Sequence, residues 1–539
     1  MMELVNRIRR EVSGRVKAMR ANAAITRFKG FSRRKWGRDA TDGRDSVVLV
    51  GLFSFFPSLF CYAYVVNYLA KKHGSRIECY QFIGQVSPLI RGVYESFGAR
   101  FGLGMEDAAE HESAAQAQAA IILAGLKTKQ DVLRITVDGL LIGDQIYDSY
   151  LRYYSEPTVR LDDPRFAEVV EQALRIYYAA RAYLARTRVT AFIVDDFSYI
   201  NAGILTRLLF QANVPLYMVA FGTPFWLLRL DPEPSGEGHN FPPPVCLPYY
   251  AYRRMFAKLS DEKKADGLRR AREALESRLS GQYCPLVGLP STSFAPGSQR
   301  VLDDGPEPKI LVMMHNFVDA PHCYRRKLFA DFYEWIVFLL ERAEKTPFRW
   351  YVKPHPYKAP RAAINAANQR VVEELKLRFP KITFLPETTS SHQILEDGLT
   401  AMFTVHGTAG HEFAYRGVPV VNCGDNPHIS YPFNIHVDTL EAYETCIREA
   451  DRLPVKVDRA DIEEFFYMHY FFLPDHLGSP VSPIDERLLV GPDWLARVNQ
   501  ATVLNDLIKG ATAEREHGLT EYFDRFFGQP DLMQTSANL

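Results

Sequence analysis

The chain has 539 residues, of which 47% are hydrophobic and 24% charged, a balance typical of a soluble globular protein with room for two domains. Its 64 Lys and Arg residues match 64 Asp and Glu residues, and the net charge of zero argues against a dedicated nucleic-acid binder. The seven cysteines are scattered without a CxxC pair, which fits a reducing cytoplasm and predicts no zinc site.

The charge is unevenly distributed, because residues 1–45 carry 13 Lys and Arg against 5 Asp and Glu. Leu4, Ile8, Val12 and Val16 recur every four residues among these cations, which predicts a basic amphipathic helix. Such a helix can lie on an anionic bilayer, and the alternatives are a solvated extension or a strap between domains. No apolar signal-peptide region starts the chain, so we expect a cytoplasmic protein, peripheral on the inner face of a bacterial cytoplasmic membrane.

Residues 46–70 contain no charged side chain and are long enough to span a bilayer. Gly51 and Pro57 interrupt this apolar run, which favours a soluble interpretation. We therefore predict a buried strand at residues 47–52, followed by a turn and a helix at residues 59–72.

From residue 46 onward, apolar strands alternate with helices, a pattern that predicts parallel α/β sheets. The strands predicted are residues 47–52, 76–83, 191–194, 215–220, 309–314, 348–352, 382–385, 401–405 and 419–422. The helices predicted are residues 59–72, 107–126, 128–141, 165–186, 202–212, 260–280, 327–345, 362–379, 391–397 and 410–416.

The stretch Lys353-Pro-His-Pro356 follows one of these strands. Each proline restricts the residue before it, so Lys353 and His355 are held extended at the strand tip. Positive charge and hydrogen-bond donors at such a place stabilise the phosphate that leaves when a nucleotide sugar reacts. The alternative is a turn that only caps the strand.

A second loop, His406-Gly-Thr-Ala-Gly-His-Glu412, follows the strand at residues 401–405. Gly407 lets a phosphate approach the backbone, and Thr408 can bond a phosphate oxygen or cap the next helix. Glu412 can accept hydrogen bonds from ribose hydroxyls, or it can merely stabilise the helix dipole. His406 is either a donor contact or a core histidine.

His315 and Asn316 open the first strand-end loop of the second half and are expected to contact the donor or to act at a domain-closure hinge. Metal binding by His315, Asp319 and His322 would need a helix that Pro321 interrupts, and no Asp-x-Asp motif is present. We therefore expect a metal-independent reaction with no cofactor besides the donor substrate.

Asp195 and Asp196 follow the strand at residues 191–194 in the first half. A carboxylate at such a strand end can act as the base that activates an acceptor hydroxyl, or as a nucleophile if the reaction retains configuration. Asp144 and Asp148 are competing candidates, and a solvated aspartate pair or a helix cap is the structural alternative.

Taken together, Lys353-Pro-His-Pro356, Thr404-Val-His-Gly-Thr408, Glu412 and Gly417-Val-Pro-Val420 resemble the donor half of bacterial capsule and lipopolysaccharide glycosyltransferases. These include β-Kdo transferases and, more distantly, sialyltransferases with a His-Pro motif. The resemblance implies that Lys353, His355, Thr408 and Glu412 contact the nucleotide of the donor and that an acid of the first domain, Asp195 or Asp196, does the chemistry. We also include His355, with Asp195 and Asp196, among the predicted catalytic residues.

The resemblance and the alternating elements predict a GT-B fold, with two doubly wound Rossmann-like domains facing a central cleft. We expect a basic extension at residues 1–45, an acceptor-side domain at 46–290, a nucleotide-sugar-binding domain at 291–458 and a helical segment packing back at 459–539. A stretch rich in Pro, Gly and Ser at residues 285–308 is the expected linker.

The predicted function is transfer of a sugar from a nucleotide-sugar donor to a bacterial surface polysaccharide or glycolipid. A CMP-Kdo-like donor is the first choice and a UDP-sugar the second. Three alternatives remain: a polyol-phosphate transferase or polymerase, a sugar-nucleotide 2-epimerase of the same fold, and a non-catalytic scaffold of capsule assembly.

Overall fold

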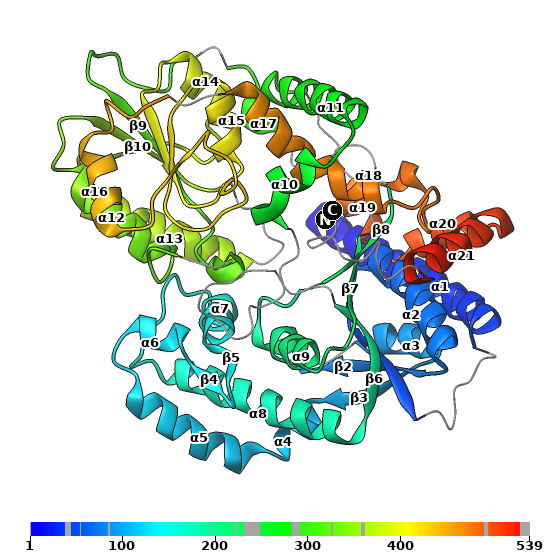
Figure 1. Cartoon of the computed structure of the whole chain (residues 1–539). Coiled ribbons are helices and arrows are strands. Elements are labelled where there is room, and N and C mark those ends of the chain that lie inside the picture. Colours follow the sequence, from blue (N-terminus) through cyan, green and yellow to red (C-terminus); the bar gives the residue numbers. More distant parts are fainter. Residues whose placement is uncertain are drawn as a thin grey trace.

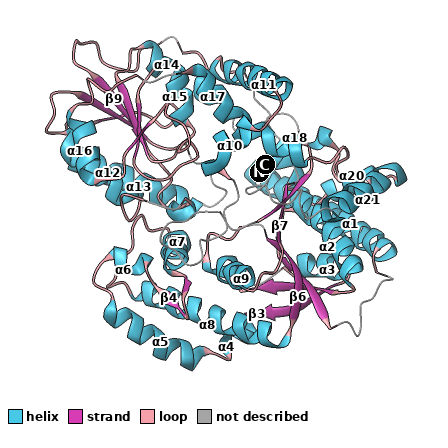
Figure 2. Cartoon of the chain, viewed as in Figure 1, coloured by secondary structure: helices cyan, strands magenta, loops and turns pink. Residues whose placement is uncertain are grey.

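The computed structural model describes most of the chain, namely residues 2–37, 45–53, 55–82, 84, 87–194, 196–220, 224–230, 248–282, 291–297, 299–324, 327–356, 362–455, 458–489 and 494–528. Two sheets, each flanked by helices, organise it (Figures 1 and 2).

The sheet of the first domain consists of β1 (Ser46–Gly51), β2 (Arg76–Gln81), β3 (Ala99–Gly104), β6 (Arg188–Val194), β7 (Leu216–Ala220) and β8 (Trp226–Arg229). Their order across the sheet is β3-β2-β1-β6-β7-β8, and neighbours are parallel except for the antiparallel pair β7 and β8. This is the strand order of dinucleotide-binding folds, with the chain reversing direction across the sheet between β1 and β6.

The sheet of the second domain consists of β9 (Lys309–Met313), β10 (Arg349–Lys353), β11 (Thr383–Phe384), β12 (Ala401–Thr404), β13 (Val420–Asn422) and β14 (Ile435–His436). These strands are all parallel and run in the order β11-β10-β9-β12-β13-β14. The same topology therefore recurs, with its switch point between β9 and β12.

The helices up to residue 279 are α1 (Met2–Lys35), α2 (Phe56–His73), α3 (Pro88–Ser96), α4 (Met105–Ala109), α5 (Glu112–Gly125), α6 (Lys129–Leu133), α7 (Gly143–Tyr154), α8 (Pro164–Arg186), α9 (Ile200–Gln211), α10 (Tyr252–Ala257) and α11 (Asp261–Leu279). The later helices are α12 (Phe332–Ala343), α13 (Ala362–Arg378), α14 (Ser391–Glu396), α15 (Ala409–Tyr415), α16 (Leu440–Arg448), α17 (Arg459–Phe466), α18 (Leu473–Leu477), α19 (Trp494–Val498), α20 (Val503–Gly510) and α21 (Ala513–Gly528). The π-helical turn Tyr467–Phe472 joins α17 to α18.

The apolar run at residues 46–70 folds into β1 and α2, as predicted. One side of α2 packs on strands of the first sheet and another side on α20, which explains why the helix is apolar almost all round. Every helix in the described part of the chain is too short or too polar to cross a bilayer.

The helix predicted at residues 128–141 is wrong beyond residue 133. α6 ends at Leu133, and β4 (Thr136–Val137) and β5 (Leu140–Leu141) then form a small hairpin. Asp138 and Gly139 at its tip both have positive φ, 48° and 80°, the conformation that an Asp-Gly turn adopts readily. The turn outweighed the helical pattern around it.

The helix predicted to begin at residue 327 begins only at Phe332. Asp331 is its N-cap and accepts a hydrogen bond from the Glu334 N–H at 2.8 Å. Residues 327–331 therefore lie outside the helix. Lys327 forms a bridge with Gly424, beyond the carboxyl end of β13.

The C-terminal helices return from the second domain to the first (Figure 1). α17 contacts α15 and α11, whereas Tyr522 of α21 donates a hydrogen bond to the Leu477 carbonyl and accepts one from the Leu227 N–H of β8. Tyr68 of α2 also bonds Asp524 at 2.6 Å. The described helices after residue 459 thus pack against both domains.

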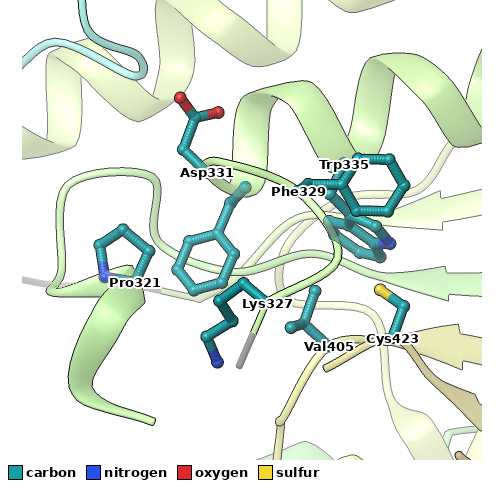
Figure 3. A pocket seen from close by; sticks show the side chains of 8 residues that line it. Pro321, Lys327, Phe329, Asp331, Trp335, Val405 and Cys423 are labelled. Atoms are coloured by element: carbon teal, nitrogen blue, oxygen red, sulfur yellow. The ribbon is translucent and has the colours of Figure 1, made fainter. Parts of the chain in front are cut away.

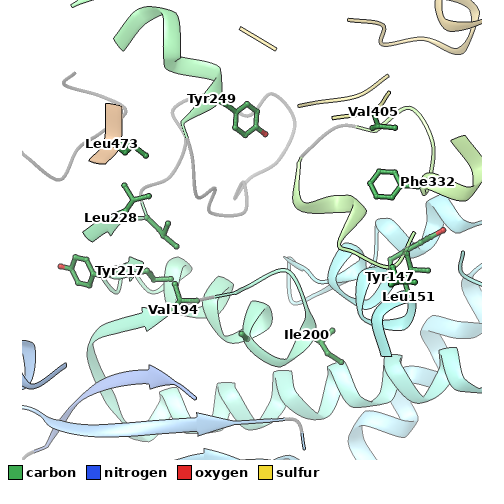
Figure 4. Close-up of a cluster of buried hydrophobic side chains, with 14 of the residues drawn as sticks. Tyr147, Leu151, Val194, Ile200, Tyr217, Leu228, Tyr249, Phe332, Val405 and Leu473 are labelled. Carbon is green, nitrogen blue, oxygen red and sulfur yellow. The ribbon is translucent and has the colours of Figure 1, made fainter. Parts of the chain in front are cut away.

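The carboxyl ends of the two sheets face each other. Tyr199, in the loop after β6, donates to Asp319, in the loop after β9, at 3.4 Å. Figure 4 draws Tyr147 and Leu151 of α7 on the side of the first domain, with Phe332 and Val405 on the side of the second. Two Rossmann-like domains with facing strand ends constitute a GT-B fold, as predicted.

Candidate functional site

The topological switch point of the second sheet is marked by two histidines in contact. His315 follows β9, His406 follows β12, and their ring centroids lie 4.5 Å apart. The Nε2 atom of His315 accepts hydrogen bonds from the backbone N–H groups of Val405 and His406, at 3.2 and 3.4 Å. His315 therefore ties the ends of β9 and β12 together, at the place where ligands of open α/β sheets bind.

The surroundings of both histidines favour the neutral form of the ring. Burial lowers the pKa of His315 and of His406 well below the ordinary value, and the nearby Lys327 and His355 lower each further. Because Nε2 of His315 accepts hydrogen bonds, its ring proton is assigned to Nδ1. Each of these basic groups disfavours the protonated form of its neighbours, and an anion bound here would offset that effect.

Lys327 lies beside the histidine pair. Its ammonium is 3.3 Å from Nδ1 of His406 and donates to the Asp425 carbonyl at 3.2 Å. The ammonium also sits 5.1 Å from the ring centroid of Tyr324. Burial lowers the pKa of Lys327 despite the favourable influence of nearby acidic groups such as Asp425.

A small, mainly apolar pocket opens next to Lys327 (Figure 3). Its lining residues are Pro321, Lys327, Phe329, Asp331, Phe332, Trp335, Val405 and Cys423. The Asp331 carboxylate points away from the Lys327 ammonium in this view, and it accepts hydrogen bonds from Tyr147 and Thr158, both at 2.5 Å. The lysine and the aspartate thus line one pocket without pairing.

Lys353 and His355 differ in exposure. Lys353 ends β10, is 3% exposed, and donates to the Ser391 hydroxyl at 3.2 Å. Burial lowers its pKa to about 8, although Glu412 works in the opposite direction. His355, two residues further on, has an exposed side chain. Desolvation lowers the pKa of its ring, and the Asp319 carboxylate acts in the opposite direction. His355 is therefore the member of this pair that can meet a ligand directly.

The other donor-side residues are placed as follows. Asn316 is buried, and its side-chain oxygen accepts from Asn368 at 2.7 Å. Thr408 is exposed, and its hydroxyl does not cap α15. Gly407 lies close to the His315 ring, because an added Cβ would stand 3.5 Å from it. A Cβ at this position would be in ordinary van der Waals contact with that ring, and its tighter contact would be the Thr404 hydroxyl at 3.3 Å.

Glu412 is held inside the protein by an ion pair. Its carboxylate accepts a hydrogen bond from Arg278 of α11, and both side chains are at most 5% exposed. The predicted role in binding ribose hydroxyls remains a prediction, but the contact shown is structural: it fixes α15 against α11.

Across the interface, Asp196 is exposed and accepts a hydrogen bond from the Ser198 N–H at 2.9 Å. Its neighbour Asp195 lies outside the described residues. The loop that carries Asp196 reaches the second domain through Tyr199, and Asp319 is also 3.5 Å from Arg152 of α7. Asp196 is thus an exposed carboxylate in a loop of the first domain that contacts the second domain.

The competing aspartates are already engaged. Asp144 forms a two-pronged ion pair with Arg207, at 2.7 and 2.6 Å, which outweighs burial and lowers the pKa of Asp144. Asp148 bonds Nδ1 of His322 at 2.5 Å across the domain interface. Both contacts favour Asp196 over these two residues as a base.

Lys327 and Arg278 were missed by the sequence interpretation. Lys327 fell inside a helix predicted too long, although the spacing of Asp331 and Glu334 is a capping signal that places the helix start later. Arg278 lies 134 residues from Glu412 in the sequence, and no local sequence pattern predicts their ion pair. Among the described residues, no cluster of three His, Cys, Asp or Glu side chains has the geometry to hold a metal ion.

Comparison with known proteins gives only distant similarities. No protein-family model matches the chain. No curated protein sequence matches it either. Among solved structures, the β-Kdo 2,4 transferase KpsC of Thermosulfurimonas dismutans aligns at 13% identity over 55% of this chain and 86% of its own, with a TM-score of 0.31.

Two further solved structures cover more of the chain. The UDP-GlcNAc 2-epimerase of Methanocaldococcus jannaschii aligns at 11% identity over 78% of this chain and 97% of its own, with a TM-score of 0.24. Alr3699/HepE of Anabaena, in complex with UDP and glucose, aligns at 9% identity over 84% and 97%, also with a TM-score of 0.24. Similarities this weak carry no functional argument, and the GT-B assignment stands on the strand order and on the facing strand ends.

Proposed function

We propose that this chain is a glycosyltransferase that moves a sugar from a nucleotide-sugar donor to a growing bacterial surface polysaccharide or glycolipid. The observation that carries the proposal is the gathering of His315, His406 and Lys327 at the switch point of the second sheet. Basic groups that depress one another's pKa are suited to an anionic ligand such as the phosphate of a nucleotide.

The reaction would run across the domain interface. The bond between the anomeric carbon and the phosphate oxygen breaks, and its electron pair leaves with the nucleotide, where basic side chains at the strand ends of the second domain, His355 among them, stabilise the developing negative charge. The acceptor hydroxyl forms the new bond to the anomeric carbon and gives its proton to a carboxylate of the first domain, for which Asp196 is the described candidate. Basic side chains supply the hydrogen-bond donors that stabilise the leaving phosphate, so we propose a reaction without a metal cofactor.

The proposed donor follows from the strand-end motif. Lys353-Pro-His-Pro356 resembles the CMP-contacting motif of β-Kdo transferases, so a CMP-Kdo-like donor is our first proposal and a UDP-sugar the second. A CMP-sugar carries one phosphate and a UDP-sugar two, and a nucleotide panel separates them.

Helix α1 supports contact with the inner face of the cytoplasmic membrane as part of this proposal. Arg15, Lys17 and Arg20 are exposed, and Met19 between them is 71% exposed. Exposed cations interleaved with apolar side chains favour binding to an anionic bilayer. Reversing the three charges to glutamate should lower co-sedimentation with phosphatidylglycerol vesicles, and unchanged sedimentation would contradict this contact.

The donor proposal is tested by thermal unfolding with CMP, CDP, UDP and GDP. A ligand that binds only the native state raises its stability by about 2.7 kcal/mol at a hundredfold excess over Kd. We expect CMP or UDP to raise the midpoint, and the corresponding CMP- or UDP-sugar to be hydrolysed slowly without acceptor. No shift with any nucleotide would contradict the proposed function and favour a scaffold.

A further inference from the structure

Lys327 is a cation whose visible contacts are all neutral. Two of its three N–H donors are directed at Nδ1 of His406 and the backbone carbonyl of Asp425. Within the described residues, no carboxylate oxygen lies at ion-pair distance from its ammonium, and no third acceptor is present. One donor therefore remains for a ligand.

Two carboxylates around this lysine have other hydrogen-bond partners. Asp331, which lines the same pocket, accepts hydrogen bonds from Tyr147 and Thr158 of the first domain. The Asp425 carboxylate accepts a hydrogen bond from Tyr250, and the hydrogen bond from Lys327 goes to the Asp425 backbone carbonyl. The site thus holds a cation but directs the neighbouring negative charges to other partners.

A half-buried ammonium without a counter-ion lowers stability, because desolvation is only partly offset by neutral acceptors. A purely structural lysine would gain from an ion pair, which is what Lys129 of the same interface makes with Glu334 at 2.7 Å. The unbalanced charge at Lys327 is explained if an anion completes the site when it binds.

The position of Lys327 defines the kind of anion. The residue pairs with Gly424 in an antiparallel bridge, which places it between the loops after β9 and after β13, with His406 of the loop after β12 at its side. Because Nδ1 of His406 accepts from the ammonium, its ring proton is assigned to Nε2, which makes this ring a hydrogen-bond donor beside the lysine. Two such donors at the end of a parallel sheet suit a phosphate group.

We propose that Lys327, with His406 as the neighbouring donor, binds the phosphate of the nucleotide donor. This inference rests on the proposed function. It adds a phosphate-binding residue, which lies in the loop between β9 and α12, to the strand-end motif around Lys353. Lys327 is a binding residue, and its partner His406 both contacts the ligand and orients the ammonium.

The test is nucleotide affinity, measured by calorimetric titration of CMP and UDP into the full chain. Lys327→Met keeps the length of the side chain and removes the charge. The matched control is Lys309→Met, because Lys309 is also a buried lysine of the second domain, but it lies at the opposite end of β9 and donates to the Asp397 carbonyl at 2.9 Å. We expect Lys327→Met to weaken binding about tenfold or more and Lys309→Met to leave Kd unchanged.

Salt dependence separates a phosphate contact from a structural role. Removing one phosphate-bound cation should make log Kd less sensitive to the logarithm of salt concentration, and Lys327→Arg should recover part of both the affinity and the salt dependence. Equal Kd in wild type and Lys327→Met, or equal losses in Lys327→Met and Lys309→Met, would overturn the inference while leaving the proposed function intact. Absence of nucleotide binding by the wild type would overturn both. If Lys327→Met does not fold, Lys327→Gln is measured in the same way.

Discussion

Lys353 offers a test of whether the donor site is maintained at a cost to stability. The side chain is 3% exposed, and burial lowers its pKa from the ordinary value of 10.5 to about 8. Below the lowered pKa the ammonium is charged in both states, and the folded state carries the full penalty, about 3 kcal/mol for this shift. Loss of the hydrogen bond to Ser391 offsets about 1 kcal/mol of that. We therefore expect Lys353→Met to raise the free energy of unfolding by about 2 kcal/mol near neutral pH.

The pH dependence has a definite sign. Between the folded pKa and the ordinary value, the unfolded chain binds a proton that the folded chain does not, so wild-type stability rises with pH relative to the variant. Urea unfolding of both proteins should show the advantage of Lys353→Met shrinking by about 2 kcal/mol between about pH 7 and about pH 9.5. A variant that is less stable than wild type at neutral pH, by an amount that does not change with pH, would refute this reasoning. Loss of nucleotide binding in the more stable variant would link the penalty to function.

Three further predictions concern the same structure. Arg278→Met leaves the buried Glu412 carboxylate unpaired and should lower the free energy of unfolding by about 3–5 kcal/mol in urea titrations. The double variant Arg278→Met/Glu412→Met should recover most of this loss. A loss smaller than about 1 kcal/mol in the single variant would contradict the contribution of the ion pair. His355→Ala should abolish donor turnover without moving the unfolding midpoint, because the side chain is exposed, and wild-type turnover would reject its role. Burial alone would lower the pKa of His322, but the Asp148 carboxylate outweighs burial and raises it. The pair therefore stabilises the protein below the ordinary pKa of 6.5 and loses this contribution as pH rises through the raised value, so the stability gap to His322→Gln should shrink with pH.

Much of the fold was predictable because buried parallel strands leave a plain signal. β1, β9 and β12 are continuous apolar runs, and polar residues follow β9 and β12, so these strands and the side chains after β9 and β12 could be located from sequence. The same logic placed His315, His406 and Lys353 at one sheet edge, and the structure brings the two histidines into contact.

The remaining features depend on contacts between distant segments. In the sequence, Glu412 has the features of a ligand-binding acid at a helix start. Only the fold shows that its carboxylate forms an ion pair with Arg278 of α11. Asp148 looks like a free candidate base until α7 meets the loop that carries His322. Lys327 was hidden by a helix predicted to start too early. Pairing across domains is set by tertiary packing, which periodicity does not encode.

The central claim is that the second domain binds a donor nucleotide between the ends of β9, β10 and β12. A crystal structure of the chain with bound CMP or UDP tests it most directly. The account predicts the phosphate within hydrogen-bond distance of Lys327 and His406, with His355 facing the bond that breaks. A nucleotide bound on the sheet of the first domain, or away from the switch point of the second, would contradict it.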